Sequence, residues 1–557
     1  MTNIKTICVI GSGAGAGPII YELSKGGHKV IVLEKGPWLK TEDYSKDEIS
    51  MTRRDVVTPL LEDEPYVIER QQINGEWKAK SNAIGGQNFW NGSVVGGSSN
   101  FMSGYFHRMK PVDFKLLSAY GNIDGANIVD WPISYDDLEP YYEKVERVVG
   151  VSGKVVKHKY LEPRSTSDFP YKPLMENYVS SLLDKAAANV GIEMIPNPRA
   201  ILSSKKGDRS PCYLSNFCGS YACSSDAKGS SRAALISDAL KTGNVQIIPK
   251  AKVFHLETDG AGKIIKAHYH SEQGDKFIEA DIFVVAAQAI ETSRLLLLSK
   301  NADFPNGLAN NNNQVGKNLI FSAGGVGGGI IDFDDYSDKE AKKLNEPGSF
   351  VNRTIHHFYE VEKEGLKVKG GVVDFLFEHA NPIGKAIRNK WNDDGTLLYG
   401  KEFQKKLKHY FTRQRKIKFE IFIDWQPNDN CFVTLDDEQT DKWGDKVARL
   451  RLQHNKHDVA VGEIMAQQCE KILEEMDCKD IYSNIGTLPP PNLQAGGCRF
   501  GDNPKTSVLD SNCKAHDVDN LYITDGSSFP TGGSVTYTWT IYANSFRVAD
   551  VIIDRLK

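Results

Sequence analysis

A glycine-rich turn between two short apolar segments near the N-terminus is the feature that most constrains how this chain can fold. Residues 6–10 have the composition of a buried strand, the spacing G-x-G-x-x-A follows, and residues 29–33 form a second apolar segment. Gly11 permits a tight turn, Gly13 lets the backbone approach a pyrophosphate, and Ala16 allows a helix to pack closely on a strand. The pattern therefore predicts a βαβ unit that binds a dinucleotide at its first turn.

An acidic residue completes this pattern. Glu34 ends the second apolar segment, 18 residues after Ala16, where a carboxylate can accept hydrogen bonds from both ribose hydroxyls. Gly15 belongs to the same turn, which leads into the positive N-terminal end of a helix. A plain α/β turn is the alternative, and the full order of strand, turn, helix, strand and acid disfavours it. The motif alone does not distinguish NAD from FAD.

Length, charge and cysteine content limit the architecture and the partners. A chain of 557 residues is long enough for two domains. The net charge of −4 does not indicate a basic surface that would bind nucleic acid. No apolar stretch approaches the ~18–20 residues that cross a bilayer. The N-terminus lacks a signal-peptide pattern, and nine mostly scattered cysteines fit a reducing compartment. We expect a cytoplasmic protein, or one exported with a partner subunit that carries the signal.

Further segments follow in a fixed order along the chain. They are Gly96–Asn100, Val284–Leu296, Val315–Leu319, Pro427–Leu435 with Asp441 shortly after it, and His516–Thr531. Together with the N-terminal turn, they resemble the signature segments of the glucose-methanol-choline (GMC) family over nearly the whole chain. Within them, Gln288 stands where the family usually has Gly, and Ser293 where it usually has Pro. The resemblance implies that the dinucleotide is FAD.

The resemblance and the pattern of apolar and polar residues along the chain together predict an α/β fold. We expect a Rossmann-like FAD-binding domain with an inserted, antiparallel-sheet (α+β) substrate domain. Residues 1–320 form the first part of the FAD-binding domain, with a surface excursion at 151–211 that is rich in Lys, Pro and Ser. Strand-like alternation assigns 321–455 to the substrate domain. Residues 456–557 return to the FAD-binding domain and bring the C-terminal segment to the flavin.

The predicted FAD contacts combine the N-terminal turn with positions that the resemblance implies. They are Gly11, Gly13, Gly15, Ala16, Glu34, Gly96, Gly97, Ser99, Asn100, Val253, Ala287, Asp525, Gly526 and Thr538.

The catalytic positions depart from the family pattern. In the family, a base histidine opens a segment resembling H-Q-A-G-T-C-R-F-G, and Leu493 occupies that position here. A second His or Asn usually lies fourteen residues before the Asp of the last helix, and here Thr536 precedes Asp550 by that spacing. Leucine cannot accept a proton, and a threonine hydroxyl without an activator is far too weak a base. The flavin-binding segments are intact, so the two substitutions predict altered chemistry.

Three interpretations remain open. In the first, the enzyme oxidises a hydroxylated substrate with a base from elsewhere, and the candidates are Thr536, Tyr537 and His357, with His356 and His379 beside them in the inserted sheet. A surface or core role for any one of these histidines is the ordinary alternative. In the second, the flavin desaturates or reduces a carbon–carbon bond. In the third, a lyase or photochemical reaction replaces net redox turnover. We rank them in that order.

Three cysteines cluster in the spacing C-x5-C-x4-C at Cys212, Cys218 and Cys223. Thiolates at such positions can ligate three irons of one cluster from a single loop. Bacterial glucose, glucoside, gluconate and fructose dehydrogenases of the GMC family have a similar trio, usually with a last spacing one residue shorter. The resemblance implies a possible iron–sulfur cluster that passes electrons to a cytochrome. A buried loop with inert thiols and an incomplete zinc site are the alternatives.

Taken together, these patterns predict an FAD-dependent dehydrogenase. Its substrate is a hydroxylated small molecule, such as a sugar or a glycoside, which transfers a hydride to flavin N5. A small subunit or a cytochrome is the expected electron acceptor. The substrate's identity, the base and the oligomeric state are not encoded in any pattern that we find.

Overall fold

A five-stranded parallel sheet, to which both ends of the chain contribute strands, forms the centre of one half of the protein. The computed structural model describes residues 4–53, 57–84, 86–392, 394–487 and 493–557. The strand order is β22–β10–β1–β2–β6. The predicted strands at 6–10 and 29–33 are present with those bounds, which confirms the βαβ unit. In sheet order, the strands are Leu521–Ile523, Ile282–Val285, Thr6–Ile10, Lys29–Leu33 and Val245–Ile248.

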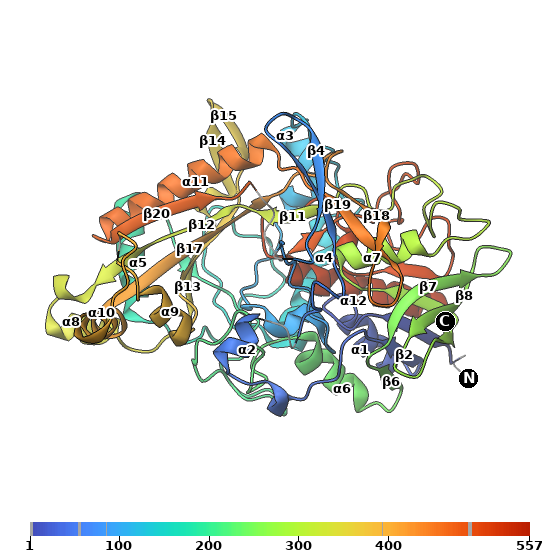
Figure 1. The fold of residues 1–557 in the computed structure, drawn as a ribbon, viewed down its shortest axis with the longest axis horizontal. Helices are drawn as coiled ribbons and strands as arrows, with labels where there is room; N and C mark the ends of the chain where they lie inside the picture. Colours follow the sequence, from blue (N-terminus) through green and yellow to red (C-terminus); the bar gives the residue numbers. More distant parts are fainter. Residues whose placement is uncertain (1–3, 54–56, 85, 393, 488–492) are drawn as a thin grey trace.

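Helices and two small sheets flank this parallel sheet (Figure 1). α1 (Gly17–Lys25) packs on α12 (Tyr537–Leu556), which in turn packs on α4 (Tyr135–Val145). α4 begins with a capping box, in which the Ser134 hydroxyl accepts a hydrogen bond from the Asp137 N–H. α7 (Ala289–Leu298) packs against the three-stranded antiparallel sheet, which consists of β7 (Lys252–Thr258), β8 (Ile264–His270) and β9 (Lys276–Glu279).

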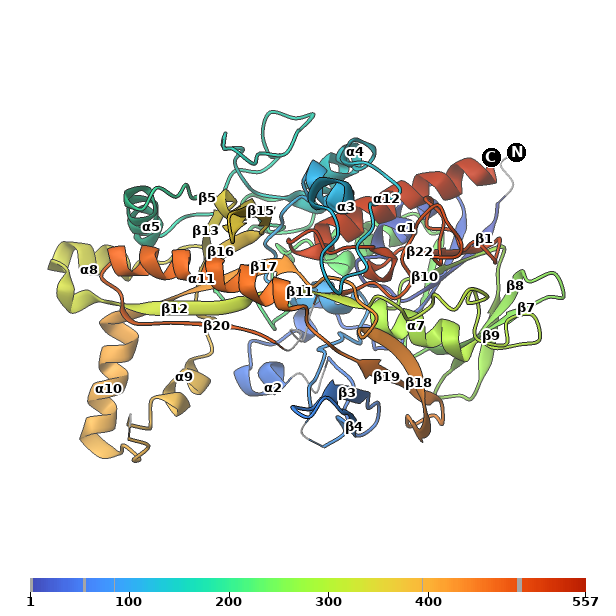
Figure 2. The same ribbon diagram turned by 90° about the horizontal axis from the view of Figure 1, so that it is seen from above.

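An antiparallel sheet builds the second half, as predicted. Its strand order is β20–β12–β17–β16–β13–β5, and β11 and β21 extend it at the end of β17. α11 (Lys456–Glu475) covers one face of this sheet and runs along its length (Figure 2). The strands are, in the same order, Lys479–Ile485, Gly325–Asp332, Gln414–Asp424, Val372–Phe377, Val351–Ile355 and Ile195–Pro196, with Ile320–Ala323 and Gln494–Ala495 at the end.

The structure differs from the predicted domain bounds in three places. α11 and β20 follow residue 455 yet belong to the antiparallel sheet. β18 (Phe432–Thr440) and β19 (Lys446–Arg451) leave that sheet and pair with β3 (Val67–Gln71) and β4 (Trp77–Ser81). The segment 151–211 is a surface excursion only in part: residues 154–173 contain no fully buried residue, whereas the later part contributes β5 and the buried side of α5 (Tyr178–Asn189) to the antiparallel half. Each difference arises from pairing between distant segments, which local composition does not encode.

The remaining elements are short or lie at the periphery. No helix among the described residues combines the length and the apolar character needed to cross a membrane. A basic stretch, residues 405–418, begins within α10 and continues into β17, which follows directly. The remaining helices and strands are α2 (Glu48–Arg53), α3 (Leu116–Tyr120), α6 (Ser237–Leu240), α8 (Asp338–Leu344), α9 (Pro382–Arg388), α10 (Gly400–Thr412), β14 (Glu360–Lys363) and β15 (Leu366–Lys369).

Candidate active site

A cavity of about 300 Å³ opens at the carboxyl ends of the parallel strands. It runs from Glu34, past the glycine-rich turn, to Leu493 and the N-terminus of α12. This is the edge at which open parallel sheets bind nucleotides. Eleven of the predicted FAD contacts line it: Gly11, Gly13, Gly15, Glu34, Gly97, Ser99, Val253, Ala287, Asp525, Gly526 and Thr538.

Three glycines fix the shape of the phosphate-binding end of the cavity. Gly11 has φ +92°, and a Cβ there would lie 2.4 Å from the Ala286 carbonyl oxygen. A Cβ on Gly15 would lie 2.7 Å from the Thr524 carbonyl oxygen, so this glycine lets α1 approach the C-terminal segment. A Cβ on Gly13 would meet nothing within 4 Å, because this residue faces the open cavity. The turn therefore has the open backbone that a pyrophosphate needs.

Glu34 lies at the end of β2, where a ribose is expected. Its carboxylate accepts hydrogen bonds from the Ser12 hydroxyl at 2.5 Å and from the Gly36 N–H at 2.9 Å. Burial raises the pKa of Glu34, and these two donors oppose that rise. Ser12 also accepts a hydrogen bond from the Gly96 N–H at 2.9 Å, so the serine joins the acid to the second FAD segment. Ser12 was not among the predicted residues, because the fingerprint leaves its position unspecified.

Three predicted contacts do not line the cavity. Ala16 is buried beneath it, where a small side chain lets α1 pack on the sheet. Asn100 donates hydrogen bonds to the carbonyls of Val95 at 3.0 Å and Gly97 at 3.1 Å, which fixes the turn around Gly96. These residues shape the FAD site from outside the cavity.

Asp525 joins two segments that both reach the cavity. Its carboxylate accepts hydrogen bonds from the Gln288 N–H at 2.9 Å, from the Thr292 hydroxyl at 2.6 Å and from the Ser527 N–H at 2.9 Å. Gln288 has φ +83°, a conformation that favours the glycine usual at this position. Its side chain compensates in part by capping α7 through the Ile290 N–H.

A buried ion cluster holds the other wall of the cavity, and sequence reasoning missed it. Asp441 accepts hydrogen bonds from Lys252 at 2.5 Å and from Arg294 at 2.7 Å, and both of these basic residues line the cavity. Burial raises the pKa of Asp441, but the two cations outweigh it and bring the pKa down to about 2. The only sequence signal for this cluster was that Asp441 lies in a segment that resembles the GMC family.

Leu493 and Thr536, which replace the family's catalytic pair, lie at the end of the cavity opposite Glu34. Leu493 lines it with φ +57°, a strained conformation for a bulky residue, and its carbonyl accepts from the Ser322 N–H at 3.1 Å. Thr536 is buried just before α12 and donates its hydroxyl to the Tyr105 carbonyl at 3.1 Å. Neither side chain can accept a proton from a substrate.

Tyr537 lines the cavity, as expected of a residue at the start of α12. Its hydroxyl is buried and makes no hydrogen bond to any residue that the structure describes. Burial, with the nearby carboxylates of Asp424 and Asp458, raises the pKa of Tyr537 well above its usual value. The phenol is therefore protonated at neutral pH, which makes it a poor general base.

The family comparison agrees with this cavity. Residues 82–322 match the model of the N-terminal domain of GMC oxidoreductases, and residues 427–545 match that of the C-terminal domain. The chain is a GMC oxidoreductase. The 2-methyl-1,2-propanediol dehydrogenase of Mycolicibacterium austroafricanum is 29% identical over 99% of this chain and 95% of its own length. The fructose dehydrogenase large subunit of Gluconobacter japonicus is 26% identical over 99% and 98%.

Solved structures support the fold. A formate oxidase from Aspergillus oryzae superposes with a TM-score of 0.64 over 100% of this chain and 99% of the other, at 14% sequence identity. As a GMC oxidoreductase, the protein binds FAD and acts as an FAD-dependent oxidoreductase on CH–OH groups.

The predicted histidines of this GMC protein do not meet at the FAD cavity. His357 is exposed and lines a second, smaller pocket with His158, Glu193 and His356. His356 is buried there, and its Nδ1 lies 3.1 Å from the Lys110 Nζ. Sequence spacing alone could not show which of the two adjacent histidines faces inward.

The cysteine trio occupies one loop beside the FAD-binding segment. Cys212, Cys218 and Cys223 are all partly buried. Lys228 joins the loop to the FAD site, because its ammonium donates to the carbonyls of Asn100 at 3.1 Å and Cys218 at 2.9 Å. Burial raises the pKa of Cys223, but Lys228 outweighs it and lowers that pKa below its usual value.

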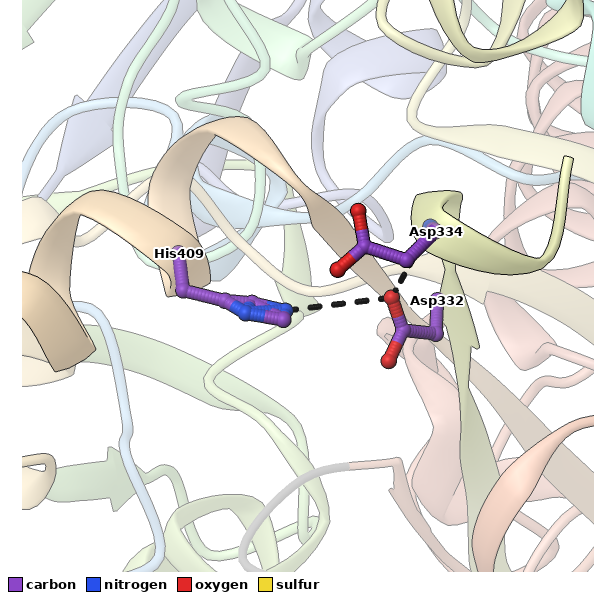
Figure 3. A group of neighbouring side chains, drawn as sticks. All are labelled: Asp332, Asp334 and His409. Atoms are coloured by element: carbon purple, nitrogen blue, oxygen red, sulfur yellow. Dashed lines mark hydrogen bonds and ion pairs between the residues drawn. The ribbon is translucent and has the colours of Figure 1, made fainter. Parts of the chain in front are cut away.

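Among the described residues, a single trio of His, Cys, Asp or Glu side chains has ligand atoms within 4.8 Å of one another. It consists of Asp332, Asp334 and His409 (Figure 3). Lys479 binds Asp332 at 2.9 Å, and Arg413 binds Asp334 at 2.8 Å. Since these cations already neutralise both carboxylates, we interpret the group as a surface ion-pair network.

Proposed function

We propose that this GMC oxidoreductase is a dehydrogenase for a small polyhydroxylated molecule, such as a sugar, a glycoside or a diol, with a proton acceptor that differs from the family's usual histidine. FAD, when bound in the cavity, supplies the hydride acceptor at N5. The observation that supports this proposal most is that the FAD cavity is fully formed, while Leu493 lines its catalytic end and Thr536 directly precedes Tyr537, which also lines it. The polyol and sugar names of the relatives support the substrate class.

The test is anaerobic mixing of the FAD-loaded protein with D-glucose, D-fructose, 2-methyl-1,2-propanediol and a long-chain primary alcohol. We expect at least one of the polyhydroxylated compounds to bleach the flavin absorbance, because a hydride then reduces the flavin. Bleaching by the long-chain alcohol alone would contradict the substrate class. No bleaching by any compound would favour the desaturating or non-redox alternatives.

We further propose that Cys212, Cys218 and Cys223 ligate an iron–sulfur cluster that hands electrons to a protein partner. Three thiols from one loop suit such a cluster, and the nearby cations of Lys228 and Arg199 would stabilise its negative charge. The relation to a dehydrogenase large subunit supports a partner subunit as the acceptor.

Assays of iron and acid-labile sulfide on anaerobically purified protein test the cluster. We expect about three irons per chain, a content that Cys218→Ser lowers, whereas Cys469→Ser, in the core of the other half, leaves it unchanged. Absence of iron in the wild-type protein would exclude the cluster.

A further inference from the structure

Residues 381–413 form an arm at one end of the antiparallel sheet, and the arm consists of α9, a short hairpin and α10. Figure 1 and Figure 2 both show α9 and α10 at the end of the molecule away from the two chain termini. None of the arm's described residues is buried or belongs to the hydrophobic core of either half. The arm is therefore not needed to complete the core, and its apolar side chains call for another explanation.

Large apolar side chains are concentrated on this arm. Six of the 18 that are exposed among the described residues lie in it, although it comprises only 33 of the 557 residues. Their exposed fractions range from 43% for Phe411 to 81% for Tyr399. Single exposed apolar side chains are ordinary on a protein surface, whereas a cluster of them indicates an interaction site. The six are Ile383, Ile387, Trp391, Leu397, Tyr399 and Phe411.

Polar contacts attach both ends of the arm to the body of the protein. The Asn381 side chain accepts a hydrogen bond from the Tyr221 hydroxyl at 2.8 Å. The Glu48 carboxylate accepts two hydrogen bonds, each of 2.7 Å, from backbone N–H groups in the first turn of α9. At the other end, the Tyr410 hydroxyl donates to the Glu378 carboxylate at 2.7 Å. These contacts fix the position of the arm and leave its apolar side chains uncovered.

The side chains of α10 are sorted by chemistry around the helix. Tyr410 faces the body, and Lys406, one turn earlier, donates to a carbonyl of the hairpin at 2.7 Å. Between this side and the opposite one runs an apolar stripe of Phe403, Leu407 and Phe411, which are spaced four residues apart. At about 100° per residue, the opposite side carries three lysines, which are Lys401, Lys405 and Lys408.

The arm is basic, although the chain as a whole is slightly acidic. It has eight lysines and arginines against three acidic residues, a formal charge of +5, whereas the whole chain carries −4. Lys390, Lys401 and Lys408 form no ion pair with any residue that the structure describes. The Lys390 ammonium instead lies over the Trp391 ring, 5.0 Å from its centroid. Positive charge beside exposed apolar side chains suits a partner that offers both negative charge and an apolar interior.

A lipid membrane and an acidic protein both offer this combination, and the composition of the arm favours the membrane. Six of its eight cations are lysines, and lysine is depleted in protein–protein interfaces. Helices that combine Lys with Trp, Phe and Leu are typical of segments that lie in the membrane interface. Trp and Tyr prefer this depth, and the long lysine stems let the ammonium groups reach the lipid headgroups.

We propose that this arm docks the protein on the surface of an anionic lipid membrane. The apolar side chains of α9, the hairpin and α10 enter the boundary between headgroups and acyl chains, and the lysines bind the anionic headgroups. The arm lies in the interface and does not cross the bilayer, because its helices have only 7 and 13 residues. The proposal does not depend on the substrate, so it stands or falls separately from the proposed function.

Co-sedimentation of the FAD-loaded protein with vesicles tests the docking. One set of vesicles contains phosphatidylcholine alone, and the other contains about a third phosphatidylglycerol, an anionic lipid. We expect binding to the anionic vesicles and binding weaker by at least about tenfold to the neutral ones. Raising the salt from about 0.1 M to about 1 M should release the protein, because salt screens exposed charges. Equal binding to both sets, or no binding to the anionic vesicles, would overturn the proposal.

A charge-reversal variant tests the lysines of α10. We expect it to bind anionic vesicles at least about tenfold more weakly, because each cation near an anionic surface contributes to binding. The matched control reverses three exposed lysines of the FAD-binding half and should bind like the wild type. Equal losses in the two variants would overturn the assignment to the arm. The variant is Lys401→Glu/Lys405→Glu/Lys408→Glu, and the control is Lys263→Glu/Lys300→Glu/Lys505→Glu.

A second variant, Trp391→Ser/Tyr399→Ser, tests the apolar side chains. We expect a loss of affinity for anionic vesicles of at least about tenfold, because less apolar area enters the lipid. The matched control is Ile73→Ser/Leu366→Ser, which changes side chains that are also exposed but lie outside the arm. All four positions are exposed, so flavin content and unfolding temperature should stay unchanged. Wild-type binding by the arm variant would overturn the insertion of the arm.

Sedimentation velocity without lipid separates the membrane from a second copy of the chain. We expect the wild type and Trp391→Ser/Tyr399→Ser to have the same oligomeric state, because the arm faces lipid. A wild-type dimer that this variant no longer forms would overturn the membrane assignment and show that the arm is a protein interface.

Discussion

The dinucleotide end of the cavity and its catalytic end are held by different kinds of contact. At the first end, backbone conformation decides the geometry: Gly11 and Gly15 allow approaches that any Cβ would block. At the second end, segments that are distant in the chain meet, as the Thr536 hydroxyl does with the Tyr105 carbonyl, 431 positions apart. The first end keeps the family pattern, and the second departs from it at Leu493 and Thr536. The comparison shows that the FAD-binding turn, which is fixed by backbone conformation, is retained even where the catalytic side chains beside it are replaced.

The largest effect is expected at the dinucleotide end. In Gly11→Ala, the new Cβ would lie 2.4 Å from the Ala286 carbonyl, and φ +92° strains any side chain. We expect the variant to lose bound flavin and about 3–5 kcal/mol of unfolding free energy, from strain and overpacking together. Flavin absorbance and urea unfolding measure both losses. The control is Gly13→Ala, whose Cβ meets nothing within 4 Å and which should unfold like the wild type. Equal unfolding of both variants would contradict the account.

A smaller loss is expected from the ion cluster on the cavity wall. Asp441→Asn leaves Lys252 and Arg294 without their shared carboxylate, and breaking a buried pair costs about 3–5 kcal/mol. Because Asp445 still pairs with Lys252, we expect the lower part of that range. Urea unfolding at pH 7 measures the loss. A variant as stable as the wild type would show that the cluster is not stabilising.

The same cluster predicts a pH dependence. The pKa of Asp441 is about 2 in the folded protein, below the value of about 3.9 for an unfolded aspartate. Its contribution is therefore fully present above that higher value and disappears as the pH falls toward 2. The stability difference between the wild type and Asp441→Asn should shrink in urea unfolding series from pH 6 down to pH 3.5. A difference that stays constant over this range contradicts the assigned pKa shift.

The smallest effect concerns the hydrogen bond from the Thr536 hydroxyl to the Tyr105 carbonyl. Thr536→Val removes the hydroxyl that binds the Tyr105 carbonyl and should cost about 1 kcal/mol of unfolding free energy. We expect Thr536→Ser, which keeps the hydroxyl, to unfold like the wild type. If Thr536→Ser behaves like Thr536→Val, the hydroxyl does not position Tyr105.

The sequence was informative where a single short segment determines the structure. The βαβ unit and the acid at Glu34 depend on neighbouring residues, and the structure confirms them. The bounds of the antiparallel half were missed, because β19 pairs with β3 from a segment more than three hundred residues earlier.

The candidate bases show the same limit. Tyr537 was a sensible choice from its position beside Thr536, but its burial keeps the phenol protonated. His357 was a sensible choice from its residue type, but the strand before it directs its neighbour His356 inward and leaves it exposed. Burial depends on how distant elements pack, and composition alone does not report it.

The most direct test of the central claim is anaerobic mixing of the FAD-loaded protein with the polyhydroxylated compounds of the panel. The account predicts that at least one of them bleaches the flavin absorbance, although Leu493 and Thr536 hold the positions of the family's catalytic pair. No bleaching by any of these compounds would contradict the account.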